Sequence, residues 1–273
     1  MYIHSCTMFC FLILIWIVRV GSIPIKNSAS TVSVNGTATP VGSHLRKSNW
    51  VTHAETLKEI SDVSLAVAEG DILLSDERLA VKSLWPAING ILSIPYMISP
   101  GVANRRDTIL AAFKMISDST CIRFHEYTNE DNYLNVIPAK GCASYVGFQG
   151  GAQPLYFDSI CSSGNLCHEV IHALGLHHEH TRPDRDHYIT IQWDEVIPGK
   201  ESNFVFKQGD TQNLAYDVES IMHYGSHYFS KNGNPTIIPK NNEVNMGQRT
   251  HLSPLDIIRI NKLYHCGEWQ REN

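Results

Sequence analysis

The sequence predicts an α+β fold in which a metal-binding helix lies between two lobes. Two observations carry this prediction. Short strand candidates surround a helix before residue 160, whereas the chain after residue 180 is richer in loops. Between these regions, residues 163–175 form a helix candidate with two histidines four positions apart. We therefore expect a mixed-sheet N-lobe, a loop-rich C-lobe and a cleft at the helix.

The elements of the N-lobe follow one another along the chain. A strand is expected at Ile91–Ile98, and Asn104 is expected to cap the next helix, because asparagine is a preferred N-cap residue. The apolar face of that helix comprises Ile109, Ala112, Phe113 and Ile116. Four further strand candidates are Cys121–His125, Tyr133–Ile137, Ser144–Phe148 and Pro154–Phe157.

The second half of the chain has fewer regular elements. The metal-binding helix is expected to start near Ser163 and to end at Gly175, and Tyr188–Ile191 is strand-like. A final helix is expected from Ser253-Pro254, because proline suits the first helical turn. Its expected core contacts are Leu255, Ile258 and Leu263.

The composition is that of an ordinary globular protein. The 273 residues are 43% hydrophobic and 18% charged, and their formal net charge is −5. This length suffices for one good core plus an accessory segment. A mildly acidic chain without a run of Lys or Arg gives no reason to expect a nucleic-acid partner.

The N-terminus has the pattern of a secretory signal. Met8–Val18 is an unbroken apolar run, shorter than the roughly 20 apolar residues that a membrane span needs. We expect a signal peptide at residues 1–22, cleaved near Ser22, with a signal anchor as the alternative. No other stretch could cross a membrane, so a secreted, extracellular protein is expected, without membrane contact after signal removal. No interface-like stripe is evident, which favours a monomer.

Residues 23–78 resemble a propeptide more than a domain. A loose lead rich in Ser and Thr is followed by a weakly amphipathic helix candidate at Thr56–Val67. Gly70 then allows a tight turn that projects the carboxylate of Asp71. By itself this is an ordinary turn. Beside a catalytic zinc site, such a carboxylate could occupy the open metal position and exclude water.

The candidate metal ligands are His168, His172 and His178. The first two lie on one face of a helix, because they are four residues apart. Gly175 allows the chain to leave the helix through a left-handed turn and to bring the third imidazole back. Three imidazoles on Zn²⁺ leave a position open for water, which is the catalytic arrangement. The alternative is a histidine-rich surface helix with incidental spacing.

These residues carry a resemblance to a known family. HEVIHALGLHHE at 168–179, together with SIMHY at 220–224, resembles the astacin family of metzincin endopeptidases. Further matching segments are TCIRF (120–124), GCASYVG (141–147), HTRPDRD (180–186), MGQRTHLS (246–253) and LYHC (263–266). The resemblance covers roughly residues 79–266 and implies the two-lobed metzincin fold.

The resemblance implies a role for each site residue. One Zn²⁺ would be held by the three histidines, above Met222 in the Met-turn. Glu169 would accept a proton from the zinc-activated water and pass it to the leaving amine. Tyr224 would be a further ligand that moves away to stabilise the oxyanion. From the residues alone, Met222 could equally be core filler and Tyr224 a buried aromatic with a satisfied hydroxyl.

The resemblance also implies that the protein is made as a zymogen. Asp71 matches the zinc-binding aspartate of a propeptide FxGD motif, although Ala68 stands where the family has phenylalanine. Cleavage by an activating protease after Arg78 would leave residues 79–273 as the catalytic domain. The new N-terminus would be buried near Glu179, which could otherwise be a surface carboxylate.

Five of the seven cysteines remain after signal removal, and in a secreted protein they indicate disulfides with one thiol left over. The resemblance implies the pairs Cys121–Cys266 and Cys142–Cys161. The remaining residue is Cys167. Three states stay open for it: a free thiol, a bond to Cys142, or a bond to another chain.

The substrate is expected to be protein or peptide. Arg249 matches a family position that forms a cationic pocket just after the scissile bond, which implies a preference for acidic residues there; an ordinary surface arginine is the alternative. The chain ends seven residues after Cys266. Since tolloids and meprins add further domains, this chain is more similar to the stand-alone, hatching-enzyme-like members.

Two other classes of function compete with a protease. A catalytically silent binding protein of the same fold would need neither Glu169 nor Tyr224, so their presence counts against it. A structural zinc module would need a closed site of four protein ligands.

Overall fold

The computed structural model describes residues 66–74, 84–87, 92–241 and 246–267. Within these residues the main element is a seven-stranded mixed sheet with the strand order β1-β2-β6-β7-β5-β3-β4. Its strands are β1 (Ala66–Ala68), β2 (Ile72–Leu74), β3 (Ser93–Ile98), β4 (Arg123–Glu126), β5 (Tyr133–Pro138), β6 (Ala143–Tyr145) and β7 (Ala152–Phe157). Strands β4, β3, β5 and β7 run parallel, and β6 is antiparallel to β7.

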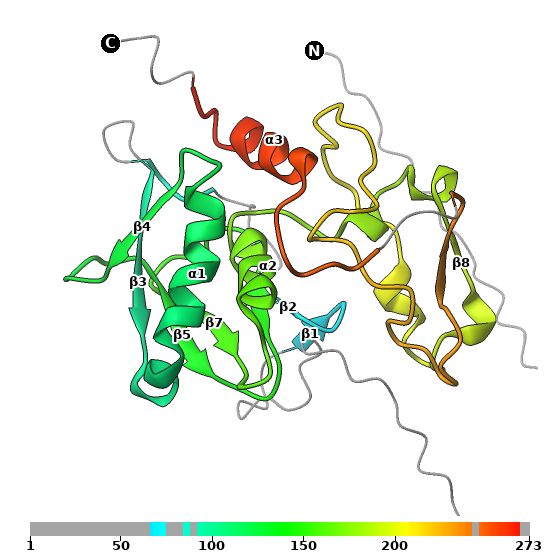
Figure 1. Ribbon diagram of the computed structural model, residues 1–273, viewed down its shortest axis with the longest axis horizontal. Helices are drawn as coiled ribbons and strands as arrows, with labels where there is room; N and C mark the ends of the chain where they lie inside the picture. The colour runs from blue at the N-terminus through cyan, green and yellow to red at the C-terminus, as the bar shows by residue number, and fades with distance from the viewer. Residues whose placement is uncertain (1–65, 75–83, 88–91, 242–245, 268–273) are drawn as a thin grey trace, which may run out of the picture. The chain divides into compact units, whose positions relative to one another are not determined.

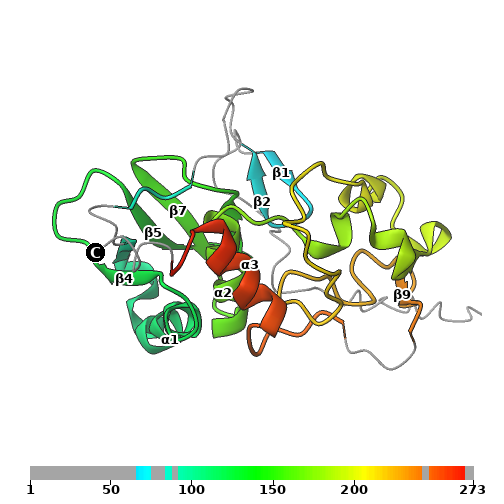
Figure 2. The ribbon, with the colours of Figure 1, turned by 90° about the horizontal axis from the view of Figure 1, so that it is seen from above.

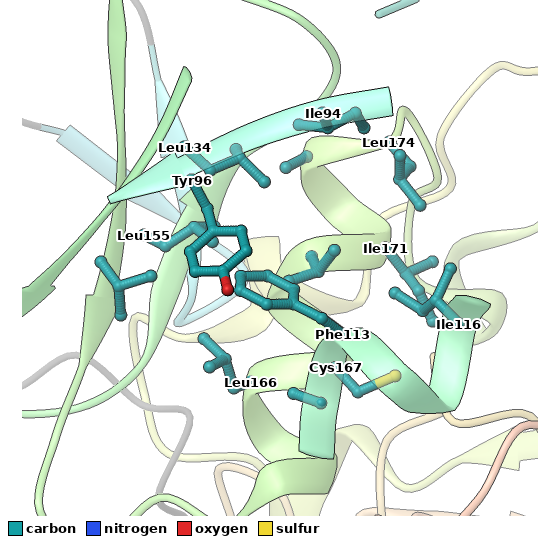
Figure 3. Close-up of a cluster of buried hydrophobic side chains, with 14 of the residues drawn as sticks. Ile94, Tyr96, Phe113, Ile116, Leu134, Leu155, Leu166, Cys167, Ile171 and Leu174 are labelled. Atoms are coloured by element: carbon teal, nitrogen blue, oxygen red, sulfur yellow. The ribbon is translucent and has the colours of Figure 1, made fainter. Parts of the chain in front are cut away.

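Two helices, α1 (Arg106–Ser117) and α2 (Ser163–Ala173), pack side by side on one face of this sheet (Figures 1 and 2). The buried side of α1 is formed by the four residues that the sequence pattern predicts: Ile109, Ala112, Phe113 and Ile116. Strand residues such as Leu134 and Leu155 meet this helix pair in one continuous hydrophobic core (Figure 3). The amphipathic helix and the sheet thus bury their apolar faces against each other, and the predicted α+β fold is confirmed.

The N-terminus of α1 differs from the prediction. Asn104 does not cap the helix, because Pro100–Arg105 forms a 3₁₀ helix (η1) that runs directly into α1. Proline at the start of that turn is compatible with helical backbone, so the helical region begins earlier than a capping asparagine suggests. Asn104 is therefore an interior residue of the 3₁₀ turn.

Helix α2 has a clear start and a clear end. The Ser162 hydroxyl accepts a hydrogen bond from the backbone N–H of Asn165, and the Asn165 side chain bonds the Ser162 N–H in return, which forms a capping box. At its other end Gly175 has φ +112°, a conformation that glycine adopts without strain. The helix thus stops where the sequence predicts, and the chain turns back toward it.

A second, smaller core lies in the C-terminal half. Strands β8 (Ile189–Ile191) and β9 (Ile237–Pro239) pair antiparallel. Around them the chain forms four short 3₁₀ turns, η2 (Glu179–Thr181), η3 (Arg185–His187), η4 (Trp193–Glu195) and η5 (Glu201–Phe204). The core includes four buried aromatic residues, Phe204, Tyr216, Tyr224 and Tyr228. This half matches the predicted loop-rich C-lobe.

Helix α3 (Pro254–Leu263) begins with the predicted Ser253-Pro254 and a second capping box, between Ser253 and Asp256. Of the three expected core contacts, Ile258 is wrong, because it is 44% exposed, and Leu255 is only partly buried. The helix turns Asp256 and Ile260 inward instead, while Leu263 is partly buried against the main core. The buried face is shifted because the Asp256 carboxylate binds the loop at Ser220.

Several other predicted elements also differ in extent. Most of the helix expected at Thr56–Val67 falls outside the described residues, and its last two positions belong to strand β1 instead. Strand β4 begins at Arg123 rather than at Cys121. Strand β6 ends at Tyr145 rather than at Phe148, because Gly147 has φ +80° and its N–H leaves the sheet to bond the carbonyl of His172.

The structure pairs Cys121 with Cys266 and Cys142 with Cys161, the pairs that the resemblance implies. Cys167 is a free thiol, fully buried on α2, and burial raises its pKa. A bond from Cys167 to Cys142 is therefore excluded, and its burial disfavours a bond to another chain. In the described part of the chain no helix is both long and apolar enough to span a membrane.

Candidate metal centre

The Nε2 atoms of three buried histidines converge on one point. His168 and His172 project from the same face of α2, and the turn at Gly175 brings His178 back to them. Nε2 of His172 lies 3.0 Å from that of His168, and Nε2 of His178 lies 3.2 Å from each of the other two. The spacing in the sequence therefore produces the predicted cluster.

Each imidazole is oriented by a hydrogen bond at its other nitrogen. Nδ1 of His168 donates to the carbonyl of Ile221 at 2.8 Å, and Nδ1 of His172 donates to the carbonyl of Leu176 at 2.7 Å. With the proton on Nδ1, each Nε2 presents a lone pair to the shared point. Burial lowers the pKa of His172 well below its ordinary value, so this ring is neutral. Together with Nε2 of His178, these two lone pairs converge as the donor set that a cation requires.

A fourth ligand atom comes from Asp71. Its Oδ2 lies 3.2 Å from Nε2 of His178 and 3.4 Å from Nε2 of His168. Tetrahedral Zn²⁺ with bonds of 2.0–2.1 Å separates its ligand atoms by roughly 3.3–3.4 Å. The four side chains thus have the chemistry and the spacing of a zinc site, with Asp71 in the position that the histidines leave open.

Asp71 reaches the cluster from the turn between β1 and β2. Glu69 and Gly70 in this turn both have positive φ, +53° and +83°. Strand β2 runs parallel to β6, and the N–H of Ser144 bonds the Asp71 carbonyl. Ser144 also donates its hydroxyl to the backbone carbonyl of Glu169 on α2, at 2.7 Å. One residue of β6 therefore ties the turn to the metal-binding helix.

The predicted catalytic side chains border the cluster. Glu169 is fully buried on α2, directly after His168. Tyr224 is also fully buried, with its ring centroid 4.6 Å from that of His178. Its hydroxyl donates to the backbone carbonyl of Glu69. The hydroxyl proposed for the oxyanion is thus held by the segment that carries Asp71.

Met222 is buried in the main core, and its carbonyl accepts the N–H of Glu179 at 3.0 Å. The turn around it is held by Asp256 of α3. That carboxylate accepts the Ser220 hydroxyl at 2.6 Å and the Ile221 N–H at 2.9 Å. Because the Ile221 carbonyl orients His168, this clamp extends from α3 to a metal ligand. The capping pattern in the sequence predicts the helix start but not this contact.

Glu179 is 1% exposed and lies among cations. It accepts hydrogen bonds from Arg182 at 3.1 Å, from the Asp217 N–H at 2.9 Å, and from Arg259 of α3. A cavity of about 260 Å³ adjoins it, lined by residues that include Gly175, Arg182, Lys207 and Arg259. The alternative of an ordinary surface carboxylate is therefore wrong.

Arg249 contacts the turn that contains Met222. Its guanidinium donates to the carbonyls of His223 and Gln248, at 3.0 and 2.9 Å. Its own backbone carbonyl stands so close to Gly164 of α2 that a Cβ at that position would overlap the oxygen. Arg249 is therefore a half-buried residue whose guanidinium is held by backbone carbonyls next to the Met222 turn, and the cationic pocket stays a prediction.

Sequence reasoning missed Glu69, whose Oε2 accepts from Nδ1 of His178 at 2.6 Å and whose Oε1 lies 3.1 Å from Nζ of Lys207. Burial acts to raise the pKa of this carboxyl, but His178 and Lys207 bring it down to about 2. It also assigned no role to His180. His180 in fact stacks on the Tyr224 ring, with centroids 3.7 Å apart. The one available signal for Glu69 was a second acidic residue two positions before Asp71.

Comparisons with known proteins give the same family as the sequence motifs. The family model described as Astacin, a family of peptidases, matches residues 80–265. The chain is 40% identical over 231 residues to zinc metalloproteinase nas-14 of Caenorhabditis elegans, covering 78% of this chain and 46% of the relative. It is 38% identical over 219 residues to mouse astacin-like metalloendopeptidase, covering 77% and 50%. The chain thus spans about half the length of these two relatives.

Shorter relatives match over more of their own length. Low choriolytic enzyme of the fish Oryzias latipes is 39% identical over 212 residues, which cover 72% of this chain and 78% of that one. The solved structure of high choriolytic enzyme 1, a hatching enzyme zinc-protease from the same fish, superposes with a TM-score of 0.64 at 41% identity. The superposition covers 67% of this chain and 94% of the other.

Proposed function

Because the chain belongs to the astacin family of peptidases, we propose that it is a secreted, zinc-dependent endopeptidase made as a zymogen. The observation that carries this proposal is the convergence of His168, His172 and His178, with Asp71 as a fourth ligand and Glu169 beside them. Peptide-bond hydrolysis needs an activated water, a base and an oxyanion donor, and each has a candidate here.

The three histidines would hold Zn²⁺ once Asp71 has left, with Met222 packed in the turn below. Zinc would supply a Lewis acid that polarises the scissile carbonyl and acidifies a bound water. The Glu169 carboxylate accepts the proton of the attacking water and passes it to the leaving nitrogen. The Tyr224 hydroxyl donates a hydrogen bond to the carbonyl oxygen as negative charge develops there.

In this proposal the segment that carries Glu69 and Asp71 keeps the zymogen inactive in three ways. Asp71 takes the fourth ligand position, and the Glu69 carbonyl engages the Tyr224 hydroxyl. Strand β2 also covers the edge of β6, where an extended substrate could otherwise add as a strand. The segment therefore blocks the metal, the oxyanion donor and the sheet edge together.

The anchor of this segment differs from the family pattern at Ala68, where phenylalanine is missing. The Glu69 carboxylate supports the turn instead, through its contacts with His178 and Lys207. A buried, charge-assisted hydrogen bond contributes more than a neutral one. In our proposal, Glu69 replaces the missing apolar anchor by an electrostatic one.

Activation is proposed to follow cleavage after Arg78, which leaves Leu79 as the first residue of the catalytic domain at 79–273. Leu84 lies against Gly175, which lines the cavity beside Glu179, and the Trp85 indole donates to the Ala173 carbonyl. The five residues from 79 to 83 can span at most about 17 Å. This reach supports insertion of the new ammonium group beside Glu179.

We also propose how the protein is secreted, how it is activated, which substrates it prefers and what role it has. Residues 1–22 would direct secretion, and a protease that cuts after Arg78 would activate a monomer. Arg249 would favour acidic residues after the scissile bond, which its positive charge beside the Met222 turn supports. A hatching-type role is proposed from the likeness to the choriolytic enzymes.

The experiment that tests the proposal is activation with trypsin, followed by cleavage of an unfolded protein substrate. We expect activity after trypsin treatment, its loss with a chelator, and its recovery with Zn²⁺. Glu169→Gln should fold and bind zinc but lose activity. A catalytically silent binding protein of this fold would show no cleavage in any arm, and activity that survives in Glu169→Gln would contradict the mechanism.

A further inference from the structure

The Tyr224 ring lies between two other flat side chains. On one face is the His180 imidazole, with a centroid distance of 3.7 Å and an interplanar angle of 24°. On the other is the Tyr228 ring, at 4.4 Å and 21°. All three residues are buried, at 0%, 0% and 7% exposure for Tyr224, His180 and Tyr228. Tyr224 thus occupies a slot with two aromatic walls, named here the Tyr224 slot.

The His180 wall is fixed by its surroundings. Its Nε2 donates to the Asn203 carbonyl at 2.9 Å, which sets the plane of the ring. The edge of Phe204 packs beside it, with centroids 5.8 Å apart. A buried ring with one bonded nitrogen and an aromatic neighbour has little freedom to rotate.

The Tyr228 wall is fixed through its backbone. The Tyr228 carbonyl accepts the Thr236 hydroxyl at 2.7 Å, and the Tyr228 N–H donates to the Gly225 carbonyl at 3.3 Å. The next residue, Phe229, has φ +54°, which is an uncommon and strained backbone conformation for a bulky side chain. Such a conformation persists only where the surroundings impose it, so the position of Tyr228 is strongly constrained.

The slot has a consequence for the Tyr224 hydroxyl. Stacked walls on both faces oppose tilting of the ring out of its plane rather than movement within that plane, so the hydroxyl stays close to the plane of the slot. At its open end that hydroxyl meets the Glu69 carbonyl in the latent form. A donor that is already oriented contributes most to a developing oxyanion, because little reorganisation is needed during the reaction.

We propose that His180 and Tyr228 are positioning residues for Tyr224, acting by stacking on both faces of its ring. This inference rests on the proposed catalytic role of the Tyr224 hydroxyl. General core packing, the competing explanation, would affect stability and every kinetic constant. Positioning affects only the step in which the hydroxyl takes part.

The test is a double-mutant cycle in the trypsin-activated enzyme with a fluorogenic peptide. Tyr228→Leu should lower kcat about tenfold at unchanged KM and zinc content, because the misplaced donor serves only the transition state. Tyr228→Phe keeps the flat wall and should stay within about twofold of the original kcat. In a Tyr224→Phe background, Tyr228→Leu should have no further effect, because the hydroxyl that it positions is gone.

The control is Tyr188→Leu, which removes a 40% exposed ring that stacks on Tyr216, a residue of the same core. It should leave kcat unchanged. Should Tyr228→Leu not fold, Tyr228→Met fills the space without a flat face and takes its place in the cycle. Additive losses in the double mutant, or an equal loss of kcat in Tyr188→Leu, would overturn the positioning role. A Tyr224→Phe enzyme with full activity would instead refute the proposed role of Tyr224 itself.

Discussion

The carboxylate of Glu69 contacts Nδ1 of His178 at 2.6 Å, although the two residues are 109 positions apart in the chain. Two carboxylates from one turn thus hold the same histidine, Glu69 at Nδ1 and Asp71 at 3.2 Å from Nε2. The second carboxylate oxygen of Glu69 is balanced by Lys207. The turn is therefore attached to the metal centre and also to the loop that carries Lys207.

Glu69→Ala should weaken latency. In a precursor protected from cleavage by Arg78→Gln, we expect basal peptidase activity to rise about tenfold, the effect of losing roughly 1.4 kcal/mol from the latent state. Asp71→Ala should raise it further, because it also vacates the ligand position. Initial rates of the uncleaved precursors measure both effects.

The control for this prediction is the activity of the same proteins after removal of the propeptide. After trypsin removes the propeptide, the Glu69→Ala and unmodified proteins have the same amino-acid sequence, so their specific activities must agree. If the protected Glu69→Ala precursor is as silent as the unmodified one, Glu69 is not an anchor.

Gly164→Ala should be strongly destabilising. A Cβ at this position would overlap the Arg249 carbonyl oxygen, and that oxygen belongs to a backbone that cannot rotate away. Overpacking of this kind costs about 1–3 kcal/mol or more. Urea titration of the free energy of unfolding measures it. Gly209→Ala, where the added Cβ meets no atom within 4 Å, is the matched substitution and should change stability by less than about 0.5 kcal/mol.

Stability should fall in mild acid through His223. Burial lowers its pKa to about 4. Its Nδ1 donates to the Tyr224 carbonyl, and its Nε2 accepts from the Tyr216 hydroxyl, so the neutral ring is fully bonded. An unfolded histidine takes up a proton near pH 6.5, which the folded one does not. The contribution of the neutral His223 ring to the free energy of unfolding is therefore complete above pH 6.5 and decreases as the pH falls toward 4.

The size of this effect follows from the pKa difference. At about 1.4 kcal/mol per pH unit, the loss between pH 6.5 and 4 amounts to about 3 kcal/mol. The free energy of unfolding of His223→Gln, which has no titrating group at this position, should depend less steeply on pH over this range, by the equivalent of nearly one proton. His172 and His180 add acid sensitivity of their own in both proteins. Equal slopes for both proteins would exclude His223 as a contributor.

The sequence predicts those parts of the site that local spacing determines. Two histidines one helical turn apart, and a glycine that reverses the chain, suffice to foresee the cluster of His168, His172 and His178. The four apolar positions of α1 were foreseen for the same reason, because a helical period places them on one face.

The parts that the sequence could not predict depend on contacts between distant segments. Nothing near Ile258 indicates that Asp256 takes the inward face of α3, because its partners Ser220 and Ile221 are more than 30 residues away. The anchor at Glu69 and the stacking of His180 on Tyr224 are of the same kind. A residue's type and neighbours in the chain do not specify such pairs.

Metal analysis of the purified, trypsin-activated protein is the decisive measurement, because the proposed hydrolysis requires a cation between the three imidazoles. Prepared without chelators, the unmodified protein should contain one zinc ion per chain, and His172→Ala should contain far less while Glu169→Gln keeps its full complement. A folded, unmodified protein that binds no zinc, or a His172→Ala protein that binds as much as the original, would contradict the assignment of this site.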